Sequence, residues 1–229
     1  MRKDGLRAAA VDTVPVMTGY LFLGFGFGLL LRQAGYGAWW ALAMSLFIYA
    51  GSMQFVAVSL LSSGAGLAAV AMTTLLVNAR HLFYGISMVD AYKGAGRKKP
   101  YLIFSLTDET YSLVSSGRTP EGMDRHTYCL TVSALDQCYW VVGSVLGSLA
   151  GSVIRVELKG IEFVLTALFV TIFTEQWLST RNHVPALVGV AVTAVCLVLF
   201  GKDLFLIPAM VLILLCLWGL LTREGRKHG

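Results

Sequence analysis

The sequence predicts an all-α, polytopic membrane protein, a helical bundle with seven or eight transmembrane helices of which one or more can be interrupted. Hydrophobic residues make up 56% of the chain and charged residues only 14%, whereas a soluble domain carries about 25% charged residues. Apolar stretches long enough to cross a bilayer, about 17–25 residues each, recur along the chain. The clearest are 15–31, 39–61, 66–89, 128–152, 160–178, 184–200 and 204–221.

Only short loops remain between these stretches, so we expect one integral membrane domain over 1–229. It comprises a polar N-terminal segment (1–14), a transmembrane bundle (15–222) and a basic tail (223–229). The N-terminal segment has no apolar core or small-residue cleavage site, so no removed signal peptide is expected.

The net charge of +5 fits basic cytoplasmic loops, and no basic stripe indicates a nucleic-acid partner. No cofactor or metal site is expected, since the cysteines lie in apolar segments as small hydrophobes: Cys129, Cys138, Cys196 and Cys216.

The number of crossings depends on residues 101–117, which follow Pro100 and carry Asp108 and Glu109. If this segment crosses, there are eight spans, both termini lie inside, and basic residues are spread almost evenly over the two sides. If it does not, there are seven spans and basic residues concentrate on the side of the C-terminus, but the basic N-terminus then lies outside. The positive-inside rule favours seven and the N-terminus favours eight, so both remain open.

Glycines form regular stripes in two of the predicted spans. Gly24 and Gly28 are four residues apart in the first, and Gly143, Gly147 and Gly151 repeat this spacing in 128–152. Small residues at such intervals lie on one helix face and let another backbone approach closely. We therefore predict that these faces are helix-packing surfaces.

The motif NARHLFYG (78–85) places a cation inside an apolar span. When residues 73–87 are wound as a helix, Arg80, His81 and Tyr84 lie on a polar half and leucine, isoleucine and phenylalanine on the other. Because an arginine at the bilayer centre costs about 2.5–3.5 kcal/mol, the polar half should face protein or a wet cavity. Arg80 then lines a substrate path, or it snorkels to the interface or holds a structural ion pair.

Two further segments carry polar groups. Asp108 shares a helix face with several hydroxyl side chains, and such a carboxylate can be a cation site or a proton carrier; the alternative is a solvated interfacial helix. In YAGSMQF (49–55), Gly51 and Ser52 weaken a helix at mid-span. An interrupted helix would offer N–H groups to a substrate carboxylate, whereas a continuous helix would use Gly51 for a close crossing. Additional polar pairs are Asp136-Gln137 and Glu175-Gln176.

These motifs resemble those of a known family. An early P-x3-G-Y span with G-x-G-x-G, then YAGSMQF, NARHLFYG and TDE in this order is similar to the AzlC-type branched-chain amino-acid exporters. The resemblance covers nearly the whole chain and is most specific from Gly51 to Gly85. It implies export of leucine, isoleucine, valine, methionine or related neutral amino acids across the inner (plasma) membrane. It also implies a small AzlD-type membrane subunit as partner.

From the residues themselves we predict a site for an amino-acid zwitterion. Arg80, or the Gly51-Ser52 backbone, would bind the carboxylate and Asp108 the ammonium group. The predicted substrate-binding residues are Arg80, Asn78, Tyr84, Gly51, Ser52, Gln54, Phe55 and Asp108, and the predicted proton-relay residues of a proton-coupled antiporter are His81 and Glu109. The alternatives are a passive channel for small polar solutes or a structural subunit of a membrane complex. No enzyme is expected, because neither GxSxG nor HExxH occurs.

Overall fold

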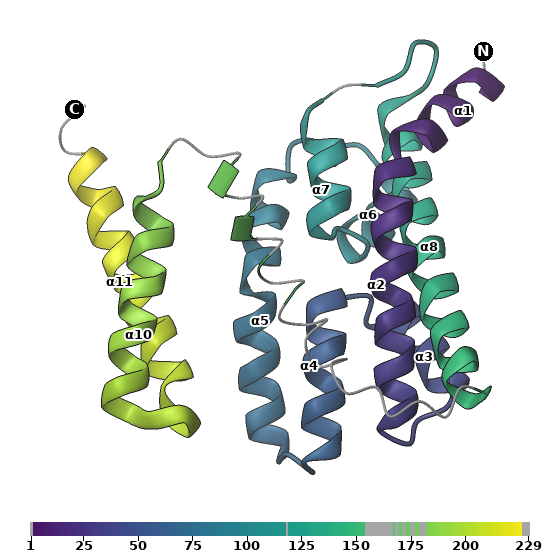
Figure 1. The fold of residues 1–229 in the computed structure, drawn as a ribbon. Helices are drawn as coiled ribbons and strands as arrows, with labels where there is room; N and C mark the ends of the chain where they lie inside the picture. The colour runs from purple at the N-terminus through teal and green to yellow at the C-terminus, as the bar shows by residue number, and fades with distance from the viewer. Residues whose placement is uncertain are drawn as a thin grey trace. The chain divides into compact units, whose positions relative to one another are not determined.

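The computed structural model describes residues 2–117, 119–153 and 182–225, with a few single residues between 167 and 178. The described residues form helices and no strand, as the apolar composition predicts. They divide into two compact units, residues 1–165 and 166–229 (Figure 1). The first unit holds Arg80 and every other predicted site residue.

Three long helices of the first unit can cross a membrane. They are α2 (Val14–Gln33), α5 (Leu67–Ser87) and α8 (Arg125–Val153), and at 1.5 Å per residue each is about 30 Å or longer. They correspond to the predicted spans 15–31, 66–89 and 128–152. A further helix, α1 (Arg2–Asp12), precedes α2, and Asp12 accepts a hydrogen bond from the Tyr128 hydroxyl at 2.9 Å.

The two glycine stripes face each other where α2 and α8 run in parallel. A Cβ atom on Gly28 would collide with backbone atoms of Ser144 and Ser148, and one on Gly147 would collide with the Phe25 carbonyl. The backbones are therefore in direct contact, with no room for a side chain between them. The predicted helix-packing surface is confirmed.

The segment 39–61, which we predicted as one of the spans, does not form a single helix. Its helices are α3 (Ala38–Phe47) and α4 (Gly51–Ser62), each only about 15–18 Å long and so too short to cross. The break lies at Tyr49, whose φ of 44° is the one positive value among the described non-glycine residues. Of the two alternatives left open at Gly51, the structure shows the interrupted helix.

Helices α3 and α4 form a hairpin, called hairpin 1 here (residues 38–62). Hairpin 1 begins just after the C-terminal end of α2, and the C-terminal end of α4 lies beside that same end of α2. Residues from the end of α4 and from the end of α2 line one cavity of about 700 Å³: Val58, Ser59, Ser62, Ser63, Leu30, Gln33 and Ala34. Hairpin 1 therefore enters the bundle and leaves it at the same end (Figure 1).

A second hairpin enters from the other end of the first unit. After the short helix η1 (Gly96–Lys98), hairpin 2 (residues 99–115) consists of α6 (Lys99–Phe104) and α7 (Asp108–Ser115). Lys98 donates to Thr127 at 2.8 Å, and Arg125 donates to the Gly117 carbonyl at 2.8 Å. Both ends of hairpin 2 thus lie beside the start of α8, so residues 101–117 do not cross.

The predicted total of seven or eight crossings is not confirmed. Four described helices are long and apolar enough to span: α2, α5, α8 and the helix that begins at Val184. The predicted span 39–61 and the undecided segment 101–117 form hairpins 1 and 2, and each hairpin returns to the end from which it entered. The predicted span 160–178, including Glu175 and Gln176, lies mostly outside the described residues.

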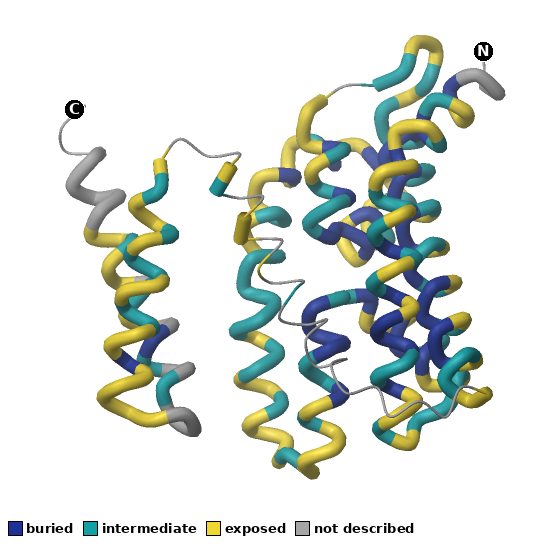
Figure 2. Tube along the Cα trace, in the orientation of Figure 1, coloured by how far each residue is buried: buried dark blue, intermediate teal, exposed yellow. Residues whose placement is uncertain are grey.

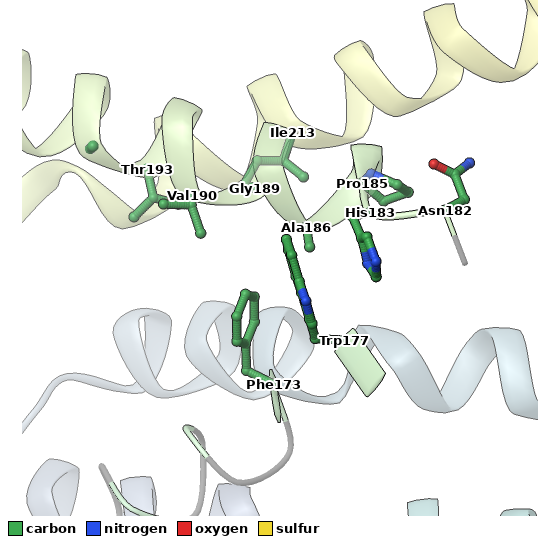
Figure 3. Close-up of a pocket in the computed structure, with 11 residues that line it drawn as sticks. Phe173, Trp177, Asn182, His183, Pro185, Ala186, Gly189, Val190, Thr193 and Ile213 are labelled. Carbon is green, nitrogen blue, oxygen red and sulfur yellow. The ribbon is translucent and has the colours of Figure 1, made fainter. Parts of the chain in front are cut away.

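The second unit contains α10 (Val184–Leu204) and α11 (Leu206–Gly225), which pack on each other and match the predicted spans 184–200 and 204–221. Beside α10 is a cavity of about 760 Å³ with a mainly apolar lining. Figure 3 shows the Trp177 and His183 rings next to each other there, stacked with centroids 4.0 Å apart. The described residues lining this cavity include no carboxylate, so these residues do not supply the charge pair that a zwitterion needs.

Burial separates an apolar surface from a mixed core in the first unit (Figure 2). Leu75, Leu82 and Ile86 on α5 are each more than 60% exposed, as expected of side chains that face lipid. Of the four cysteines, Cys129 and Cys196 are buried as predicted, but Cys138 and Cys216 are exposed. A membrane helix can direct an apolar side chain to lipid as readily as to the core. The apolar surroundings of Cys138 and Cys216 in the sequence therefore did not determine whether these two side chains are buried.

Candidate functional site

The candidate site lies where the two hairpins meet α5. The α4 helix of hairpin 1 starts at Gly51, and the α7 helix of hairpin 2 starts at Asp108. The hairpin tips are close together, since the rings of Tyr49 and Phe104 are 6.3 Å apart. Two helix N-termini, each with a partial positive charge, therefore come together inside the bundle. The start of α7 is capped by Thr107, whose hydroxyl accepts from the Thr110 N–H at 3.3 Å.

Arg80 of α5 joins both of these helix starts. Its Nη1 is 2.5 Å from Oδ2 of Asp108, and its Nη2 donates to the Ser52 hydroxyl at 2.6 Å. The Arg80 and Asp108 side chains are 27% and 23% exposed. The arginine thus neither snorkels outward nor faces lipid. The structure brings together Arg80, Ser52 and Asp108, three residues that are far apart in the sequence.

Several polar atoms at this junction have no partner. Nε of Arg80 and Oδ1 of Asp108 are buried without a hydrogen bond to any described residue. Oδ1 of Asn78 is also unpaired, but Asn78 precedes Arg80 by two residues on α5 and so projects from a nearly opposite face of that helix. No side chain caps the N-terminus of α4 at Ala50. Leaving buried polar atoms unpaired costs about 1–3 kcal/mol each, which native sites tolerate where a ligand or water binds. The junction therefore offers a free cationic donor beside a free anionic acceptor.

Two further polar residues of α5, Tyr84 and Ser87, contact hairpin 2. The Tyr84 ring stacks on Tyr111 at a centroid distance of 4.6 Å, and Ser87 donates to the Tyr111 hydroxyl at 3.1 Å. The His81 ring is 6.0 Å from that of Tyr84, and its Nδ1 is 3.3 Å from the carbonyl of Asn78. Tyr84 and His81 are half-buried at the edge of the junction.

Gln54 and Phe55 lie in the packed core instead. Both are fully buried. Oε1 of Gln54 accepts from the Trp140 indole at 2.9 Å, and Phe55 makes an edge-to-face contact with Phe27 at 5.8 Å. Their side chains thus hold α4 against α2 and α8, and the structure does not bring them to Arg80. Gly51 marks the helix start, where an added Cβ would lie 3.1 Å from the Trp140 ring.

A second polar cluster adjoins the Arg80 junction on the far side of α7. Glu109 accepts from the Tyr20 hydroxyl at 2.7 Å, and further hydrogen bonds lead to Asp136 on α8. Sequence reasoning noted Asp136 but missed Tyr20, Thr107 and Thr110. Hydroxyl residues are common in membrane helices, so only the tertiary contacts single these three out.

Known proteins resemble this chain over most of its length. The family model described as AzlC protein matches residues 15–154, the part that contains both hairpins and Arg80. "Branched-chain amino acid transport protein AzlC" of Bacillus subtilis (strain 168) is 42% identical over 208 residues, covering 91% of this chain and 82% of the relative.

Two further relatives are named uncharacterized membrane proteins. One, from Helicobacter pylori (strain ATCC 700392 / 26695), is 45% identical over 205 residues and 90% of each chain. The other, from Haemophilus influenzae, is 40% identical over 225 residues, 98% of this chain and 92% of its own. No solved structure matches the chain. The family model, the relatives of 40–45% identity over most of the chain and the apolar helices agree: the chain is a multi-pass membrane protein and belongs to the AzlC family.

Proposed function

We propose that the protein is a secondary active exporter of branched-chain and related neutral amino acids across the inner (plasma) membrane. Transport is coupled to protons and requires a small AzlD-type membrane subunit. The name of the Bacillus subtilis relative supports the substrate class, and the family resemblance supports the partner and the direction. The observation that carries the proposal is Arg80, held between Ser52 and Asp108 at the meeting point of the hairpins.

The unpaired atoms at the junction match the two ends of a zwitterion. Nε of Arg80 and the free N–H groups at the start of α4 donate to the substrate carboxylate. Oδ1 of Asp108 accepts from its ammonium group. A charge-assisted hydrogen bond contributes about 1.5–3 kcal/mol, so a pair of them distinguishes an amino acid from an uncharged solute of the same shape.

The Arg80–Asp108 pair also explains why the transporter without bound substrate has no unpaired charge buried at the site. Without substrate the two side chains neutralise each other, and a bound zwitterion adds one positive and one negative charge, so the net charge of the site is unchanged. Movement of either hairpin tip then opens the site to one side of the membrane without exposing a lone buried charge, which would be costly. This alternating exposure is the transport step that we propose.

The proposal is tested by efflux of labelled leucine, valine and methionine from preloaded proteoliposomes, with and without the small subunit and a proton gradient. Arg80→Lys keeps the charge but lacks the planar fork that reaches Asp108 and Ser52 from two separate nitrogens, and Asp108→Asn removes the acceptor charge. We expect each to lower efflux by about tenfold to a hundredfold, which corresponds to one lost charge-assisted hydrogen bond.

The matched controls are Arg97→Lys and Asp90→Asn, both at exposed positions outside the junction, which should transport like the wild type. Normal efflux by correctly inserted Arg80→Lys and Asp108→Asn variants would remove these residues from the site. Flux that rises with concentration without saturation would instead indicate a channel.

A further inference from the structure

We propose that Asp136 and Glu109 are the two ends of a proton relay that runs through Tyr20, Thr107 and Thr110. The relay stores one proton inside the bundle and delivers it to the edge of the Arg80 junction. This inference rests on the proposed proton-coupled transport, because it names the groups that would carry the coupling proton. Asp136 has no role in the substrate site described above.

The relay is a continuous chain of short oxygen–oxygen contacts across three helices. Glu109 and Tyr20 are 2.7 Å apart, Tyr20 and Thr107 are 2.7 Å apart, Thr107 and Thr110 are 3.1 Å apart, and Thr110 and Asp136 are 2.8 Å apart. All four distances are within the range of O–H···O hydrogen bonds or close to it. The three hydroxyl residues are at most 6% exposed.

The chain has one hydrogen too few if both carboxyl groups are ionised. Four contacts need four hydrogens, but the three hydroxyl groups supply one each. If Tyr20 donates to Glu109, Thr107 to Thr110, and Thr110 to Asp136, no hydrogen remains for the 2.7 Å contact of Tyr20 with Thr107. Two bare lone pairs at this distance repel each other, so one further proton completes the chain.

That proton can be placed at either end of the chain. When the proton is on Glu109, Glu109 and each of the three hydroxyl groups donate a hydrogen bond to the next group toward Asp136. When the proton is on Asp136, Asp136 and each of the three hydroxyl groups donate a hydrogen bond to the next group toward Glu109. Transfer from one end to the other moves one hydrogen across each of the four contacts; each hydroxyl oxygen gives one hydrogen and takes one. The total number of protons is unchanged and no other reactant is needed.

The two ends differ in their surroundings. Asp136 is completely buried, and the titratable side chains facing it are acidic or phenolic: Glu109 of α7, Tyr49 of hairpin 1, Tyr101 of α6 and Tyr128 of its own helix. No ion pair recorded among the described residues includes Asp136. Because an ionised carboxylate without a cation is costly to bury, Asp136 is suited to hold the proton.

Glu109 lies beside the proposed binding site, directly after Asp108 in the first turn of α7. A substrate ammonium group at Asp108 would favour the ionised form of a carboxyl group nearby. Binding would therefore keep the proton on Asp136, and release of the substrate would make its transfer to Glu109 easier. The relay thus links occupancy of the site to the position of one proton.

Infrared difference spectroscopy of the purified protein tests the shared proton without any transport assay. The wild type should show the carbonyl stretch of one buried carboxylic acid. Asp136→Asn and Glu109→Gln should each abolish this band, because the amide N–H supplies the missing hydrogen and leaves the other carboxyl ionised. Asp90→Asn, at an exposed position, should keep it. A band that survives either relay substitution, or no band in the wild type, would overturn the proposal.

The coupling role is tested in proteoliposomes that contain the complete transporter. Asp136→Asn and Tyr20→Phe should reduce proton-driven accumulation of leucine by about tenfold or more, whereas leucine counterflow, which needs no net proton movement, should persist. Tyr36→Phe, in the loop between α2 and α3, is the matched control. Thr110→Ser should retain coupling and Thr110→Val should lose it, which separates the hydroxyl group from a folding defect.

Full proton-driven accumulation by Asp136→Asn, or accumulation driven by sodium alone, would contradict the relay. Absence of leucine counterflow in the wild type would instead refute the proposed function, and the infrared result would still decide whether the proton is shared.

Discussion

Arg80 is a charged residue in an otherwise apolar span, and its contacts show how the protein accommodates it. The guanidinium group is neutralised by Asp108 and hydrogen-bonded to Ser52, so little of its charge faces lipid. A buried ion pair of this kind contributes little net stability compared with apolar residues, but loss of one partner is costly. The contribution of the Arg80–Asp108 pair to the free energy of unfolding can therefore be measured separately from its role in substrate binding.

We expect Arg80→Ala to lower the free energy of unfolding by about 3 kcal/mol, because it leaves Asp108 as a largely buried, unpaired carboxylate. The double variant Arg80→Ala/Asp108→Ala should recover most of this loss while remaining inactive in efflux. Thermal unfolding in detergent measures both variants, with Arg97→Ala as the control. Purely additive losses in the double variant would show that the two side chains do not act as a pair.

At the scale of the elements, small residues and helix breaks determine the arrangement. The glycines of α2 and α8 bring two membrane-spanning helices into backbone contact. Tyr49 and Thr107 mark turns where the chain reverses within the bundle. Because each turn is followed by a new helix, its unsatisfied N–H groups are placed at the junction and not at the membrane surface.

Gly147→Ala tests the close approach of α2 and α8. The added methyl group would overlap the Phe25 carbonyl, so the helices must separate, at an expected cost of about 1–3 kcal/mol in stability. Gly19→Ala on α2 is the matched control, since a Cβ there meets nothing within 4 Å. The measurement is the unfolding midpoint in detergent. Equal midpoints for the two variants would contradict the packing.

At the scale of the whole chain, the two hairpins lead to a topology that hydropathy does not predict. Hairpin 1 begins and ends at the C-terminal end of α2, and hairpin 2 begins and ends at the N-terminal end of α8. A pair of hairpins that enter from opposite ends can expose one shared site to either side in turn. This arrangement supports the proposed transport step, for which a single continuous span would offer no hinge.

Cysteine labelling in intact cells tests this topology in a variant without the four native cysteines. Gln33→Cys and Ser63→Cys flank hairpin 1 and should react with an impermeant thiol reagent from the same side of the membrane. Lys93→Cys and Glu121→Cys flank hairpin 2 and should both react from the opposite side. If residues 39–61 formed a crossing, Gln33→Cys and Ser63→Cys would instead label from different sides.

Part of the site could be predicted from local pattern. The polar face of 73–87 identified Arg80, and the weak helix signal at Gly51 identified the break in hairpin 1, because both depend on residues within a few turns of each other. Gln54 and Phe55 share that motif, yet their side chains pack against Trp140 and Phe27. Which way a side chain faces on a short helix depends on its neighbours, and these come from distant segments.

The sequence by itself determined that the chain is a helical membrane protein, because apolar composition and segment length suffice for that conclusion. It also determined that Arg80 needs a polar environment, since an isolated charge is costly in a bilayer. The partners of Arg80, the reversal of both hairpins and the contact of Tyr20 with Glu109 were decided only by the tertiary structure. Each joins residues that are distant in sequence, so no local periodicity specifies them.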